Sequence, residues 1–203
     1  GPMNIPNAGY FYNKVDIQNV FDIATLSDDS FVVAGHYLDE YRLTRFADDG
    51  NRVTTFGSET GALAGQIVLQ HKPVRVLVDQ ADGMDLDDDL IYIASTTPLG
   101  FQLSRYTAAG QLDLSFGRNG YTTPVADTML TSLILDGDRL IVGGSVSSGD
   151  AFRVYAFSTD GHLVASPDHF TATSSAPAVD VNKGALAFDD DVLILPPAVL
   201  NGQ

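Results

Sequence analysis

Short apolar runs of four or five residues recur along the chain, each bounded by turns rich in Asp and Gly. The runs begin at Phe31, Leu90, Leu140 and Val192, so the pattern returns roughly every 50–60 residues. Runs of this length and composition predict β-strands, and repetition at this period predicts stacked or radially arranged units. No segment keeps a 3.6-residue apolar period over a helical length. The pattern therefore predicts an all-β fold.

Each of the first three runs is preceded by one apolar segment and followed by two more, and the fourth is preceded by one. Asp and Gly separate them and tolerate the positive φ angles of tight hairpin turns. The last segment of each unit is expected at residues 53–57, 112–117 and 163–165. Four strands in series indicate one blade of a β-propeller. We expect a β-propeller-like array of about three and a half four-stranded antiparallel blades.

The expected array forms a single domain over residues 1–203. Its blades lie at about residues 15–65, 66–125 and 126–180, with a partial blade at 181–203. Residues 7–10 are similar to residues 118–121, so the sequence begins near the last strand of one blade and stops midway through another. Open strand edges favour association. A strained four-blade closure, a homodimer that completes a larger ring, and part of a longer array are the alternatives.

The most specific pattern lies in the second unit, over residues 101–120. There, an apolar run ends in Arg-aromatic, a turn ends in Gly, and Leu-Asp-x-x-Phe-Gly-x-x-Gly follows. This segment resembles the delta-60 repeat of bacterial proteins. The first unit keeps Arg45 and Phe56-Gly57, whereas the third has Ala156 in place of the arginine. The resemblance implies a propeller-like array, often part of a larger bacterial surface or secreted protein, and it implies no activity.

Composition narrows the classes of partner. The 203 residues are 44% hydrophobic, which is enough for a substantial core, and there is no cysteine for disulfides or thiolate chemistry. The formal net charge is -15. This balance argues against a nucleic-acid partner, because phosphate contacts need clustered Lys and Arg. It is compatible with a cationic protein partner, with bound calcium, or with a solvated acidic surface.

The sequence leaves the location in the cell open. No apolar stretch approaches the ~18 residues of a membrane span, and the first residues lack a basic region followed by an apolar one. We therefore expect no membrane span and no signal peptide, which fits a cytoplasmic protein or export without one. Gly1-Pro2 before Met3 is typical of the remnant of a cleaved expression tag.

A run of alternating acidic residues in the second unit is the candidate metal site. Asp85, Asp87 and Asp89 can present several oxygens to a hard cation such as Ca²⁺. The run lacks the glycine and the closing glutamate of a calcium-binding loop. The alternative is an elongated acidic hairpin turn, since the other units have acidic turns at the same place. No other cofactor is indicated.

Two tyrosines and two arginines are the candidate ligand-binding residues. Tyr37 and Tyr41 bracket an acidic loop, and exposed aromatic rings beside carboxylates suit sugar stacking or a protein interface. Strand-edge packing is the alternative for both.

Arg45 and Arg105 occupy the same place in two units and can bind a carboxylate or a sugar at the propeller axis. The alternative is a structural role, in ion pairs or in bonds to backbone carbonyls between blades. Asp113 and Asp22 are the expected ion-pair partners in that case.

No catalytic motif stands out, because there is neither a Gly-x-Ser-x-Gly elbow nor a nucleotide-binding fingerprint. We therefore expect a non-catalytic binding or interaction module whose blade loops contact a protein or a carbohydrate. One alternative is an acidic inhibitor or immunity-type protein that binds a cationic partner. The other is a hydrolase with its site on the propeller axis.

Overall fold

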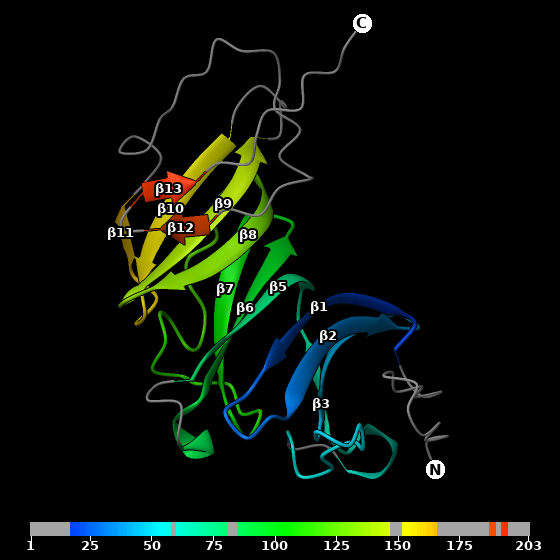
Figure 1. Cartoon of the computed structure of the whole chain (residues 1–203). Helices are drawn as coiled ribbons and strands as arrows, with labels where there is room; N and C mark the ends of the chain where they lie inside the picture. The colour runs from blue at the N-terminus through cyan, green and yellow to red at the C-terminus, as the bar shows by residue number, and fades with distance from the viewer. Residues whose placement is uncertain are drawn as a thin grey trace, which may run out of the picture. The chain divides into compact units, whose positions relative to one another are not determined.

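The computed structural model of the chain is all-β, as the sequence predicts (Figure 1). The structure describes residues 17–57, 60–80, 85–146, 152–165, 187–189 and 192–194. In these ranges the helical segments are two short 3-10 turns, η1 (Gly61–Leu63) and η2 (Leu86–Asp88). Neither of these has the length or the apolar character to cross a membrane, and the described residues contain no other candidate.

The first sheet contains four antiparallel strands in chain order. They are β1 (Asn19–Thr25), β2 (Phe31–Tyr37), β3 (Glu40–Phe46) and β4 (Gln66–Leu69). The pairing of β1 with β2 shifts register between Val20 and Asp22, which marks a β-bulge.

The second sheet has the strand order β5-β6-β7. Its strands are β5 (Lys72–Asp79), β6 (Leu90–Thr97) and β7 (Gly100–Thr107). Isolated bridges from Phe101 to Val125 and from Ser104 to Tyr121 place a further extended segment along β7.

The third sheet has the order β11-β10-β9-β8 (Figure 1). Its strands are β8 (Thr128–Asp136), β9 (Arg139–Val146), β10 (Phe152–Ser158) and β11 (Leu163–Ala165). A separate antiparallel pair, β12 (Ala187–Asp189) and β13 (Val192–Ile194), follows. Much of the expected partial blade, residues 181–203, lies outside the described residues.

The chain divides into two compact units. One contains residues 1–92 and 106–112, and the other contains residues 93–105 and 113–203. The first sheet lies in the first unit and the third sheet in the second.

The expected fourth strands at residues 53–57 and 112–117 are not strands. Arg52, just before the first segment, forms an isolated bridge with Phe46, and the chain then turns. In the second segment Leu112 bridges Tyr106 and Gly117 bridges Tyr121, with a turn between them. The turns bury a phenylalanine, Phe56 or Phe116, which is at most 1% exposed. In the first sheet the fourth strand is instead β4, just beyond the expected boundary at residue 65. The third such segment is a strand, β11, as predicted.

The core comes from the inward-facing residues of the central strands. Largest among the fully buried side chains are Tyr92, Phe56, Phe101, Phe116, Phe157, Leu26, Leu43, Ile91, Ile93, Leu103, Leu140 and Ile141. Several of these belong to the apolar runs that define the repeat, so the periodic pattern marks the core of each sheet.

Candidate functional site

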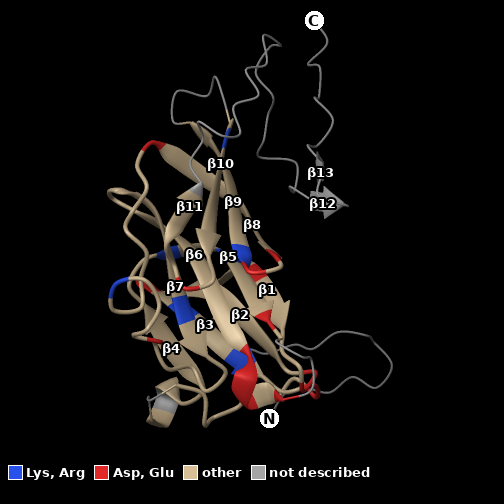
Figure 2. Ribbon diagram, turned by 90° about the vertical axis from the view of Figure 1, so that its left-hand side faces the viewer, with Lys and Arg blue, Asp and Glu red and all other residues tan. Residues whose placement is uncertain are grey.

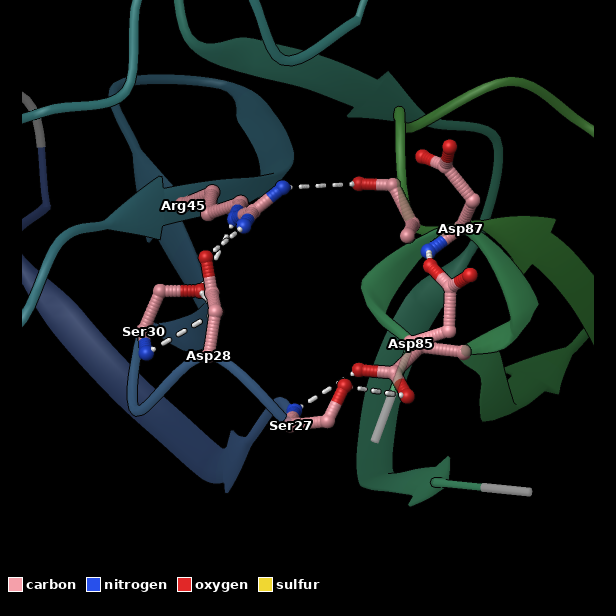
Figure 3. A network of polar contacts seen from close by, with 8 residues as sticks. Ser27, Asp28, Ser30, Arg45, Asp85 and Asp87 are labelled. Carbon is pink, nitrogen blue, oxygen red and sulfur yellow. Dashed lines mark hydrogen bonds and ion pairs between the residues drawn. The ribbon is translucent and has the colours of Figure 1, made fainter. Parts of the chain in front are cut away.

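Arg45 lies on β3 at the centre of a polar network in the first unit (Figure 3). Its Nη2 pairs with Asp28 Oδ2 at 2.7 Å, and its Nε donates to Ser30 Oγ at 2.9 Å. Nη1 donates to the backbone carbonyl of Ala108 at 3.2 Å. The side chain is buried, so the ion pair and the hydrogen bonds offset the cost of removing the guanidinium from water.

Arg105 lies on β7 and makes the same kind of contacts in the second unit. Its Nε donates to Asp113 Oδ2 at 2.9 Å and its Nη2 to Ser115 Oγ at 3.0 Å. Nη1 donates to the carbonyl of Thr159 at 2.7 Å. The guanidinium also lies 5.1 Å from the ring centroid of Phe116, within cation–π range.

A Phe-Gly pair makes a second bond to the same two turns. The N–H of Gly57 donates to the carbonyl of Ala109 at 2.8 Å, and the N–H of Gly117 donates to that of Asp160 at 2.7 Å. We call the arginine and the Phe-Gly pair the docking residues. The turns that receive their bonds, residues 107–110 and 158–161, are called acceptor turns.

Each acceptor turn ends in a glycine that the contact requires. Gly110 and Gly161 have φ angles of +80° and +86°, where only glycine is unstrained. A Cβ on Gly161 would lie 2.9 Å from the Gly117 nitrogen, and one on Gly110 would lie 2.8 Å from the Gly57 nitrogen. A larger residue would therefore push the Phe-Gly pair away.

The ion pair between Arg105 and Asp113 confirms one of the two expected partners. The other expectation is wrong, since Arg45 pairs with Asp28 in the β1–β2 turn. Asp22 instead accepts from the N–H of Val76 at 2.9 Å. These contacts do not test whether either arginine also binds a ligand.

The carboxylates beside the two arginines have lowered pKa values. Burial by itself would raise the pKa of Asp113, but hydrogen bonds from the Ser115 hydroxyl and N–H and the charge of Arg105 outweigh it and lower the pKa. The same balance of burial against the Ser30 bonds and Arg45 lowers the pKa of Asp28.

The acidic segment proposed as a metal site forms η2 and its caps. Asp85 accepts from the N–H of Asp87 at 3.0 Å, as an N-cap residue does (Figure 3). Asp89 is fully buried and accepts from both the N–H and the hydroxyl of Ser27, each at 2.8 Å. Asp87 and Asp88 are exposed.

Three or more metal-ligating side chains do not converge anywhere among the described residues. These residues exclude 81–84, which immediately precede the acidic segment. Calcium binding by Asp85, Asp87 and Asp89 therefore stays a prediction.

Tyr41 belongs to an aromatic group at the start of β3. Its ring centroid lies 5.4 Å from that of His36 and 6.2 Å from that of Phe21. Lys72 Nζ lies 5.3 Å from the Phe21 ring. Tyr41, His36 and Phe21 are half-buried, so each ring combines a packed part with an accessible part.

Tyr37 lies at the end of β2, beneath the guanidinium of Arg42, which is 4.8 Å from its ring centroid. Arg42 also pairs with Glu40 at 2.7 Å and donates to Gln66 Oε1 at 3.0 Å. Between the two tyrosines, Leu38 is 59% exposed at the tip of the hairpin.

Sequence reasoning missed Arg42, Phe21 and Lys72 as neighbours of the tyrosines. The alternation of β3 was a usable signal for Arg42, because it puts Glu40 and Arg42 on one face of the strand. Nothing in the sequence indicated Phe21, which lies at the β1 bulge.

Acidic residues lie mostly in the connections between strands (Figure 2). The β1–β2 turn with Asp28 belongs to this acidic set, whereas the acceptor turn at residues 107–110 contains no acidic residue. The location of the charge explains how a chain of net charge -15 keeps apolar strand centres.

No family model matches the chain, and no curated protein matches it. Among solved structures, the chain is similar to one titled "Crystal structure of the eukaryotic initiation factor", with a TM-score of 0.48 and 12% identity. The match covers 78% of this chain and 35% of that chain, so this chain spans about a third of its length.

Proposed function

We propose that the chain is a non-catalytic binding module of β-propeller type that uses the connections between strands to contact a protein or a carbohydrate. The observation that supports this is the aromatic group at the β2–β3 hairpin. Partly exposed rings of Tyr37, Tyr41 and His36 flank the exposed Leu38. Rings of this kind, with polar groups at their edges, are typical of sugar-stacking and protein-contact surfaces.

The charged residues beside the rings favour a ligand with polar groups over a purely apolar ligand. Arg42 lies over the Tyr37 ring and Lys72 over the Phe21 ring, and Glu40 pairs with Arg42, so both charges are present beside the rings. Arg45 is bonded to a turn in the folded chain, so the proposed contact surface rests on the tyrosines rather than on that arginine.

The test is a glycan array of defined oligosaccharides probed with the whole chain, followed by titration of each hit. Tyr41→Ala and Leu38→Ser are expected to weaken binding at least tenfold. The control is Leu99→Ser, since Leu99 is 71% exposed in the β6–β7 hairpin turn. Binding that Leu99→Ser reduces as much as Leu38→Ser would contradict a site at the β2–β3 hairpin.

A second candidate is binding of a cationic protein, which the exposed Asp87 and Asp88 and the net charge of -15 favour. Poly-L-lysine is the probe. Its affinity for the chain is expected to fall steeply between low and physiological salt and to fall further in Asp87→Asn. Salt-independent binding would exclude this second candidate.

A further inference from the structure

Among the described residues, three turns of one kind are present together with two sets of docking residues. Residues 47–50 close in the same way as the two acceptor turns, with Gly50 N–H donating to Ala47 O at 2.9 Å and Ala47 N–H to Asn51 O at 2.8 Å. The corresponding bonds of residues 107–110 are 2.8 and 2.9 Å, and those of residues 158–161 are 2.9 and 2.8 Å. Gly50 has a φ of +79°, like its two counterparts.

In this comparison, the carbonyls of Asp48 and Asp49 correspond to those of Ala108 and Ala109, which accept the docking bonds. Within the ranges that the structure describes, no donor reaches either carbonyl. Arg45 and Gly57 are already bonded to residues 107–110, and Arg105 and Gly117 to residues 158–161. The third sheet has Ala156 at the position of the arginine.

A second, independent observation concerns the face of β3 next to this turn, where two buried polar atoms lack hydrogen-bond partners among the described residues. Thr44 and Gln66 are paired across β3 and β4, and both are fully buried. Thr44 Oγ1 and Gln66 Nε2 have no hydrogen-bond partner in the described part of the chain. A buried polar atom without a partner is costly, which points to a group that supplies one.

The third sheet shows what the equivalent position contacts when docking residues are present. Tyr155 on β10 corresponds to Thr44 on β3, because each lies two residues before the aromatic residue that precedes the turn. The Tyr155 hydroxyl lies 3.0 Å from Thr128 Oγ1. Its ring lies 5.3 Å from that of Phe101, on the same face of β7 as Arg105.

We propose that residues 47–50, with the face of β3 that carries Thr44, form a third acceptor site for a repeat unit of the same type on a partner polypeptide. The arginine of that unit would donate to the Asp48 carbonyl, and its Phe-Gly N–H to the Asp49 carbonyl. The exposed carboxylates of Asp48 and Asp49 favour an incoming cation. A second copy of this chain does not meet the requirement, since both sets of docking residues in its described part are engaged.

The probe is a synthetic peptide with the sequence of residues 100–121, added to the ¹⁵N-labelled whole chain. Shifts of the Asp49 and Gly50 amide signals are expected on titration. A peptide with Arg105→Ala is expected to bind at least tenfold more weakly. On the receptor, Gly50→Ala is expected to abolish binding, because a Cβ at the equivalent Gly110 would lie 2.8 Å from the docking nitrogen.

Gly137→Ala is the matched receptor control. Gly137 also has a positive φ, +57°, but a Cβ there would meet nothing within 4 Å. This variant carries backbone strain of the same kind and should bind the peptide as the unchanged chain does.

A second version of the test serves if the free peptide is too poorly folded to bind. The same peptide joined ahead of residue 1 by a flexible Gly/Ser linker has an effective concentration in the millimolar range. The Tm is expected to rise, and Arg105→Ala within the added peptide is expected to remove the rise.

Three results would overturn the proposal. One is that neither the free nor the linked peptide moves the Gly50 signal. Another is peptide binding that persists in Gly50→Ala, which would place it at another turn. The third is a chain that sediments as a dimer with its Gly50 amide protected, which would make a second copy the occupant.

Discussion

Arg45 and Arg105 share a requirement that their sequence positions alone do not reveal. Each is a buried cation, and each is satisfied by one carboxylate, one serine hydroxyl and one backbone carbonyl. The carbonyl belongs to a turn more than 50 residues further along the chain. A lysine has too few donors in a fixed geometry to replace these contacts. Each guanidinium therefore binds a turn that lies far along the sequence.

Replacement of Arg105 tests this role. Arg105→Met leaves Asp113 without its ion pair and the Thr159 carbonyl without one donor, so we expect a loss of about 2–4 kcal/mol in the free energy of unfolding. Urea denaturation measures it. The control is Arg139→Met, which removes an exposed pair with Asp136 and should cost less than about 1 kcal/mol. Equal losses in the two variants would contradict the role of Arg105.

The lowered pKa of Asp113 predicts a pH dependence. A carboxylate whose pKa is lower in the folded chain stabilises it fully above the unfolded-state pKa of about 3.9, and this contribution is lost as the pH falls through the folded-state pKa. The free energy of unfolding should therefore decline as the pH falls below about 5 and continue to decline through the lowered pKa of Asp113. In Asp113→Asn the decline should be shallower. An unchanged slope in that variant would mean that Asp113 does not contribute.

At the scale of elements, the acceptor turn is the unit that repeats most faithfully. Its closing bonds and its positive-φ glycine recur at residues 47–50, 107–110 and 158–161. The strand that follows varies, since β4 completes the first sheet while β11 completes the third. At residues 107–110 and 158–161, two carbonyls and the glycine of the turn meet the docking residues directly.

Two glycine substitutions distinguish the cost of a steric contact at the acceptor turn from the cost of backbone strain at a positive φ. Gly161→Ala should cost about 2–4 kcal/mol, because a Cβ would lie 2.9 Å from the Gly117 nitrogen in addition to the strain of a positive φ. Gly137→Ala, with the strain alone, should cost about 1–2 kcal/mol. Thermal and urea unfolding of both variants measure the difference. A smaller loss for Gly161→Ala than for Gly137→Ala would exclude a tight contact at the turn.

Sequence reasoning predicted the element type well, because apolar runs of strand length between Asp- and Gly-rich turns leave few alternatives. It placed strands at residues 53–57 and 112–117 where the chain turns. The apolar residues there, Phe56 and Phe116, are buried by contact with an acceptor turn rather than by pairing in a sheet. The apolar pattern of a sequence predicts which side chains are buried, but it does not indicate which part of the chain covers them.

The same limit applies to the candidate sites. The pair of Arg105 and Asp113 was predictable because the two residues lie eight positions apart in one repeat. The partner of Arg45 was not, because Val53 replaces the aspartate and Asp28 from another turn supplies the charge. The bond between Asp89 and Ser27 joins residues 62 positions apart, which a single sequence does not reveal.

At the scale of the whole molecule, one contact recurs in both compact units. Each unit contains one docking arginine and one Phe-Gly pair, and both are bonded to an acceptor turn of the same unit. Repetition of a whole contact, rather than of strands alone, explains why the Arg-aromatic and Phe-Gly positions stand out in the sequence. Both units are expected to form this contact in solution.

Native-state amide hydrogen exchange at Gly57 and Gly117 tests that claim most directly, because their N–H groups make the two Phe-Gly bonds. We predict that both amides exchange at least about 1,000-fold more slowly than in an unstructured peptide. Protection at Gly117 should fall in Gly161→Ala. Exchange of either amide within about tenfold of the unstructured rate would contradict the account, since an unprotected N–H is not bonded to an acceptor turn.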